Sequence, residues 1–215
     1  MLEYFRPGGP FHTALVELFG QEMADEIRST MLEAIRTGMG PRYVASALVR
    51  TLGQGLTWAL RTARTSMLYG YREATIAGYR RNSHVVTGWR WHAHLTDDRV
   101  CMSCVAQHGT LHSLDEMLND HHNGRCAMVP ETILWSDLGV QTNEVSEFQS
   151  GRAWFDTLPE ARQRQLMGQS MYQAWRDGAV SWNQLSRPYH DQVYGSMLRT
   201  PSLIELLGNL AEEYY

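Results

Sequence analysis

The chain has 215 residues, of which 43% are hydrophobic and 20% charged, a composition typical of a folded protein with its own core. No apolar run approaches the roughly 20 residues of a membrane-spanning helix, so we expect no contact with a membrane. The 19 basic and 23 acidic residues give a formal net charge of −4, which argues against a surface built as a whole to bind nucleic acid.

The first 84 residues have the pattern of a helical region. Apolar residues recur at three- and four-residue steps over 11–38, which predicts one helix that ends at two glycines. A second helix is expected to begin at Pro41 and to end at a glycine, 53 or 55. The longest helical pattern follows over 56–81. The starting residues lack the basic patch and apolar stretch of a secretory signal, so we expect synthesis in the cytoplasm.

The helix expected over 56–81 has one small, apolar arc with a basic edge. The apolar arc consists of Leu60, Ala63, Met67, Tyr71, Ala74 and Ala77. The basic edge consists of Arg61, Arg64 and Arg72. Two interpretations remain open: the arginines form a solvated edge of a core helix, or they bind acidic groups of a partner protein or phosphates.

Residues 85–130 are expected to form a small β-containing insert. Trp89, Trp91 and Ala93 alternate with polar residues, as in a half-buried strand. A loop-rich segment follows over 96–130, in which a capping-box pattern at 113–116 predicts a single helical turn.

Residues 131–215 are expected to form a connector and a helical C-terminal region. The connector covers 131–150, and a helix is expected from a second capping-box pattern at Thr157 to a stop at 177–178. A short piece around Trp182 and a last helix near Thr200 complete the chain. The sequence therefore predicts a mainly α protein with a small β insert, an α+β fold with a helical body and a zinc-knuckle-like segment.

The insert carries a group of cysteines and histidines with metal-ligand spacing. Cys101 and Cys104 form a Cys-x-x-Cys pair whose sulfurs can reach one ion, and Cys126 with His121 or His122 would complete a tetrahedral structural zinc site. We prefer His121. Two other interpretations are reduced thiols that only pack, and a disulfide among the three cysteines. His92 and His94 could also form a metal pair, although alternating polar residues on a solvated face are the more common explanation.

The order of these motifs resembles the Mu F-like family of phage minor head (head morphogenesis) proteins. The resemblance covers roughly 40–130, and the preceding Arg61-Thr62-Ala63-Arg64 is similar to a helix of that family. The sequence departs from the family pattern at Val100, His122 and Gly124, and the glycine removes one candidate metal ligand. The matching elements are Trp89-x-Trp91, Asp97-Asp98-Arg99-Val100-Cys101-x-x-Cys104, Gly109, His121-His122-Asn123-Gly124-Arg125-Cys126 and Pro130.

The resemblance implies a structural protein of the virion of a tailed bacteriophage, made in the host cytoplasm. Its expected partners are portal or capsid proteins of the same phage, and its expected role is in head morphogenesis, DNA packaging or ejection. No enzymatic activity and no small-molecule substrate are implied. Non-specific contact with packaged DNA through Arg61, Arg64 and Arg72 is a further expectation.

The alternative function is a zinc-supported nuclease of the His-Asn-His type. Residues 120–123, Asp-His-His-Asn, offer a general base beside a metal. Such chemistry needs an ion open to phosphate and a second histidine or asparagine on a following helix. The next histidine is His190, and no second Cys-x-x-Cys follows, so the structural role is favoured.

Overall fold

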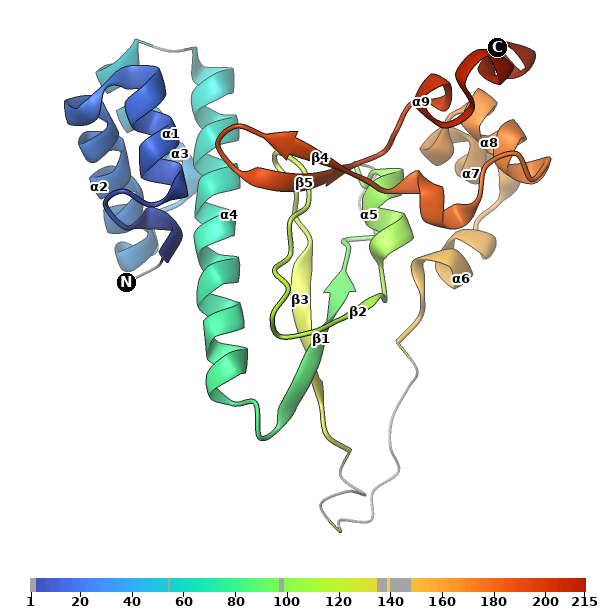
Figure 1. Cartoon of the computed structure of the whole chain (residues 1–215), viewed down its shortest axis with the longest axis horizontal. Coiled ribbons are helices and arrows are strands. Elements are labelled where there is room, and N and C mark those ends of the chain that lie inside the picture. The colour runs from blue at the N-terminus through green and yellow to red at the C-terminus, as the bar shows by residue number, and fades with distance from the viewer. Residues whose placement is uncertain (1–2, 54, 97–98, 135–138, 140–147) are drawn as a thin grey trace. The chain divides into compact units, whose positions relative to one another are not determined.

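The computed structural model describes residues 3–53, 55–96, 99–134, 139 and 148–215. These residues, drawn in Figure 1, form two compact units, and each unit is built from three separate stretches of the chain. The first unit contains residues 1–81, 121–125 and 190–197, and the second contains 82–120, 126–189 and 198–215. The first unit is mainly helical, and the second combines short helices with a small sheet, which confirms the predicted α+β class. Among the described residues, none of the helices combines the length and the apolar character that crossing a membrane requires.

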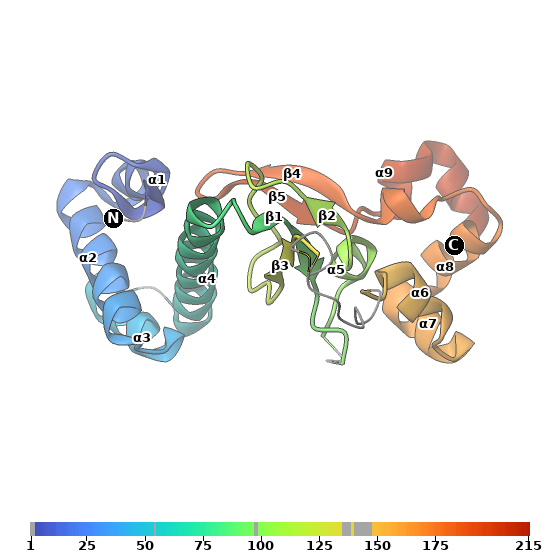
Figure 2. The same cartoon turned by 90° about the horizontal axis from the view of Figure 1, so that it is seen from below.

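The first unit is built from helices around an apolar core. Helix α2 packs on α1 and α3, and α3 packs on α4 (Figures 1 and 2). Tyr4, Phe5 and Phe11 bring aromatic rings together at centroid distances of 5.0–5.2 Å in the core. The elements are η1 (Glu3–Phe5), α1 (Pro10–Phe19), α2 (Gln21–Thr37), α3 (Pro41–Leu52) and α4 (Leu56–Arg81).

The single helix predicted over 11–38 is wrong, because Gly20 divides it into α1 and α2. Gly20 has φ 82° and ψ 166°, a conformation that residues with a Cβ rarely adopt and that ends the helical hydrogen-bond pattern. The apolar periodicity continues across the break, so it did not reveal the interruption. The helices predicted at 41 and 56–81 are confirmed.

Helix α4 buries only part of the face that was predicted to be covered. Ala63 and Met67 are buried as expected, but Tyr71 is 42% exposed and Ala74 is also exposed. Arg72, predicted on the basic edge, is only 7% exposed. A mean rotation of 100° per residue accumulates error over 26 residues, and the neighbouring helices determine which side is covered.

The second unit contains an antiparallel sheet in the order β2-β1-β3 (Figure 2). Trp89 lies opposite both His112 and Pro130, and Trp91 lies opposite Met128. Trp89 and Trp91 are 0% and 1% exposed, which confirms the alternation read from the sequence. The strands are β1 (Val86–His92), β2 (Leu111–His112) and β3 (Ala127–Thr132).

The remaining described part of the second unit is helical and has its own core. Helix α5 packs on α6 and on η3, and Met102, Val105 and Phe155 are buried among the residues of α8 and α9. The elements are α5 (Met102–Gln107), α6 (Gly151–Asp156), α7 (Glu160–Met167), α8 (Gln169–Arg176), η3 (Trp182–Leu185), α9 (Leu203–Leu207) and η4 (Gly208–Tyr214).

Three local predictions in this unit are wrong. Gly168, with φ 84°, divides the helix expected after residue 157 into α7 and α8. The Thr157 hydroxyl bonds the Trp154 carbonyl at the end of α6, so it does not cap the next helix. Ser113 begins a turn and no helix, although its backbone N–H donates to the Glu116 carboxylate at 2.8 Å. Most of the connector predicted over 131–150 lies outside the described residues.

Two strands were not predicted: β4 (Arg187–Asp191) and β5 (Gly195–Arg199) form a hairpin. Asp191 stabilises its turn, because one carboxylate oxygen accepts the backbone N–H groups of Val193 and Tyr194 at 2.9 and 3.0 Å. The strands are short and mostly polar, so their apolar alternation is too weak to indicate a strand.

His108 makes the second unit sensitive to acid. Its Nδ1 accepts the backbone N–H of Ala93 at 3.0 Å, and burial together with nearby His92 lowers the pKa of His108 to about 4. The unfolded chain binds a proton near pH 6.5, so stability is complete above this value and falls as pH drops toward 4. We expect the free energy of unfolding to fall by at most about 3 kcal/mol over this pH window.

Urea titrations at several pH values test this prediction. His108→Asn should make the free energy of unfolding less dependent on pH, because the asparagine side chain can accept the hydrogen bond from Ala93 but does not titrate. The exposed control His84→Asn should retain the pH dependence, and equal slopes for the two variants would contradict the assignment.

Candidate metal centre

Cys101 and Cys104 lie at the start of α5. Cys101 is the N-cap residue, and its Sγ accepts the backbone N–H of Cys104 at 3.4 Å. The first turn of a helix presents unpaired N–H groups and a partial positive charge, which favour a thiolate. Cys104 is 5% exposed and Cys101 is half-buried, so the pair is largely shielded from solvent.

His121 is oriented by the backbone that follows it. Its Nδ1 is 2.9 Å from the carbonyl oxygen of His122. A carbonyl can only accept, so Nδ1 carries the proton and Nε2 is the ring nitrogen that can bind a metal, an arrangement common in metal-binding histidines. Asn123, with φ 57°, and the bond from Gly124 N–H to the His121 carbonyl at 2.8 Å form the tight turn that holds this loop.

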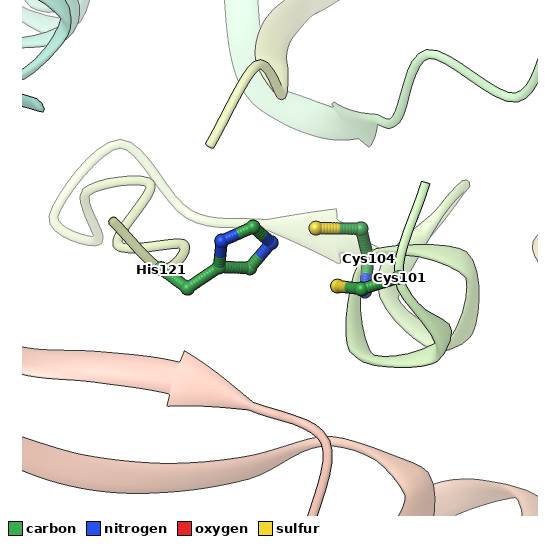
Figure 3. Close-up of side chains that lie close together, drawn as sticks. All are labelled: Cys101, Cys104 and His121. Atoms are coloured by element: carbon green, nitrogen blue, oxygen red, sulfur yellow. The ribbon is translucent and has the colours of Figure 1, made fainter. Parts of the chain in front are cut away.

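The side chains of Cys101, Cys104 and His121 converge (Figure 3). One ligand atom from each lies within 4.8 Å of the other two. In a tetrahedral zinc site with bonds of about 2.3 Å, ligand atoms are about 3.8 Å apart, so a small inward movement lets all three reach one ion. The three residues can therefore hold a metal ion. Sulfur and imidazole donors suit zinc, and carboxylate-rich sites suit harder cations.

Cys126 lies next to Cys104, but its Sγ does not belong to the group of ligand atoms that lie within 4.8 Å of one another. It is 5% exposed, and its backbone N–H donates to the Asp120 carboxylate at 3.3 Å. Hydrogen bonds from Cys104 to Cys101 and Cys126, together with burial, raise the pKa of the Cys104 thiol far above its usual range. A bound cation reverses this preference, because it stabilises thiolates directly. The three cysteines do not form a disulfide with one another.

The structure separates the two adjacent histidines. His122 directs its Nε2 to Asp191, with 2.9 Å between the nitrogen and the carboxylate oxygen, while His121 joins the cysteines. His92, at the end of β1, and His94, just after it, are both exposed, and neither belongs to a metal-ligand cluster among the described residues. A sequence cannot distinguish neighbouring histidines in a loop, because their directions depend on a residue 69 positions away.

The three arginines predicted as a contact edge differ in accessibility. Arg61 and Arg64 are exposed, whereas Arg72 is buried. The expectation that Arg72 contacts a partner or DNA is therefore wrong for the described conformation. Asp97 and Asp98, which belong to the recognised motif, lie outside the described residues.

Other motif positions have structural roles. Gly109, with φ 87°, closes the turn after α5, and its N–H donates to the Trp91 carbonyl at 2.8 Å. Pro130 lies opposite Trp89 in the sheet. Sequence reasoning missed Asp191 and Tyr194, and nothing in their local sequence indicates that they lie beside His122.

Comparisons of the chain with protein-family models, with curated proteins and with solved structures found no match.

Proposed function

We propose that the protein is a non-enzymatic structural component of the head of a tailed bacteriophage, related to the Mu F-like minor head proteins. Two observations support this proposal. The motifs follow one another in the order of that family, and three of the motif residues, Cys101, Cys104 and His121, converge in space. The convergence is the main support for the proposal, because a chance match to the motif would not be expected to bring its cysteines and histidine together in space.

The metal in this proposal is a structural zinc ion. Cys101, Cys104, His121 and Cys126 would hold it, and bound zinc supplies a tetrahedral crosslink without redox chemistry. The crosslink would join the start of α5 to the loop that leads into β3. Residues 113–126 have little regular structure, so a crosslink at His121 and Cys126 would help to hold them in one conformation.

The expected partners are portal or capsid proteins of the same phage. Exposed Arg61 and Arg64 offer charge for such an interface or for non-specific contact with packaged DNA. The proposed location is the virion, after synthesis in the host cytoplasm.

The location is tested directly in purified particles. We expect the protein to co-purify with DNA-filled heads through a density gradient, and to be found by a site-specific label at the portal vertex. A copy number far below that of the major capsid protein is expected. Complete separation of the protein from washed particles would contradict the proposal.

A DNA-cleavage assay distinguishes the structural role from the nuclease alternative. A closed site with three sulfurs and one imidazole leaves no position for a phosphate oxygen. Purified protein incubated with supercoiled plasmid and Mg²⁺ or Mn²⁺ is therefore expected to leave the plasmid intact. Nicking that is lost in His121→Ala and in His122→Ala would support the nuclease instead.

A further inference from the structure

The first unit contains a cavity of about 150 Å³ that the metal centre does not use. It lies where the end of α1 meets the first turns of α4, the loop 121–125 and the turn of the β4–β5 hairpin. Its apolar walls are Phe11, Leu15, Leu18, Phe19 and Val193. Leu18 is 55% exposed, so this part of the cavity wall is accessible from solvent.

The polar side of the cavity is held in place by a hydrogen-bond network. Asp191 bonds the imidazole of His122 and the backbone of its own turn, and the Tyr194 hydroxyl is 2.9 Å from the Ser66 hydroxyl on α4. The network connects the hairpin turn to the helix, so the cavity is formed before any ligand binds. Both oxygens of Asp191 have partners, which hold its carboxylate in place.

Arg61 gives the cavity its positive charge. It is exposed and lines the cavity, and in the described portion of the chain no ion pair or hydrogen bond engages its guanidinium. Arg64, also exposed, follows three residues later on the same side of α4. An apolar cavity lined by the Arg61 guanidinium, with Arg64 about one helical turn further along α4, is complementary to an apolar group that carries a negative charge nearby.

The volume identifies the size of that group. A cavity of about 150 Å³ accommodates a benzene-sized group, whereas pockets for drug-sized ligands measure roughly 300–1,000 Å³. One aromatic or branched aliphatic side chain has the matching size. Interfaces between proteins commonly concentrate their binding energy in such a filled pocket.

We propose that this cavity is a docking site for an acidic peptide segment of a protein partner, which inserts one apolar side chain and places a carboxylate at Arg61. The inference rests on the proposed function, since it names the chemistry of the partner surface that a head protein would recognise. DNA is less suitable, because a duplex offers phosphates to Arg61 but no apolar side group to fill the cavity.

The test uses the full chain, zinc-loaded, and the synthetic peptide acetyl-Gly-Asp-Glu-Phe-Glu-Asp-Gly-amide. We expect saturable NMR shifts at Val193 and Leu18 with a Kd below about 1 mM. Replacing the phenylalanine of the peptide with alanine should weaken binding by about thirtyfold. Arg61→Glu should weaken it by about tenfold, and Arg50→Glu, an exposed arginine on α3, should leave Kd within about twofold.

A second variant tests the cavity without changing charge. Val193→Trp is expected to fill the cavity and to block the peptide, while the unfolding midpoint stays close to that of the parent chain. The proposal is overturned if the peptide does not bind, if Arg61→Glu and Arg50→Glu behave alike, or if 3-phenylpropionate alone binds as tightly. It is also overturned if a DNA duplex displaces the peptide while the alanine peptide binds equally well. Because zinc content and particle location are measured separately, a negative result here leaves the proposed function standing.

Discussion

Cys104→Ser is expected to lose its zinc and much of the stability of the second unit. Serine cannot supply a thiolate, and its introduction would leave half-buried Cys101, buried Cys126 and the His121 imidazole without the cation that they would share. Structural zinc contributes about 10–16 kcal/mol of binding free energy in small zinc-finger peptides, so even a fraction of this is large beside typical folding stability. We expect less than a tenth of the parent zinc content by elemental analysis, and an unfolding transition that EDTA no longer changes.

The adjacent histidines supply a matched control. His121→Gln should reproduce the loss of zinc, whereas His122→Gln should retain the metal, because the His122 side chain bonds Asp191 and only its backbone carbonyl supports His121. Equal zinc contents in the two variants would contradict the ligand assignment. Zinc that survives Cys104→Ser would contradict the cluster itself.

Gly151→Ala is expected to be the most destabilising change of a glycine. A Cβ at Gly151 would lie 1.8 Å from the carbonyl oxygen of Val105 and 2.9 Å from its carbonyl carbon, and both are backbone atoms that cannot turn aside. The N–H of Gly151 also bonds the His108 carbonyl at 2.8 Å, so α6 cannot move away without losing this bond. We expect a loss of about 3 kcal/mol or more in the free energy of unfolding, measured in urea.

Gly78→Ala serves as the control for this prediction. Gly78 lies within α4, and a Cβ there meets no heavy atom within 4 Å. Alanine has the higher helix propensity, so we expect a gain of about 0.5–1 kcal/mol. If Gly151→Ala proves as harmless as Gly78→Ala, then α5 and α6 do not approach one another as described.

Strong periodicity made parts of the fold predictable. The helices at 41–52 and 56–81 and the buried tryptophans of β1 follow from the spacing of apolar residues. The breaks at Gly20 and Gly168 were missed, because each glycine interrupts the backbone while the apolar spacing continues. The spacing of apolar residues indicates which side of a helix or strand is buried, but it does not indicate the backbone φ angle of a single residue.

The candidate site was predictable in its donor types and not in its geometry. Cysteine spacing identified Cys101, Cys104 and Cys126 as candidate ligands, because few other uses require three sulfurs so arranged. The separate direction of His122 depends on Asp191 in a hairpin that sequence patterns did not reveal. The cavity beside Arg61 was equally hidden, since four distant segments contribute to it.

X-ray absorption at the zinc edge of the purified full chain tests the central claim most directly. Shared coordination by residues 101, 104, 121 and 126 predicts one zinc per chain, with about three sulfur neighbours near 2.3 Å and one nitrogen neighbour at about 2.0–2.1 Å. A first shell of oxygen and nitrogen alone, or no zinc retained after dialysis, would contradict it.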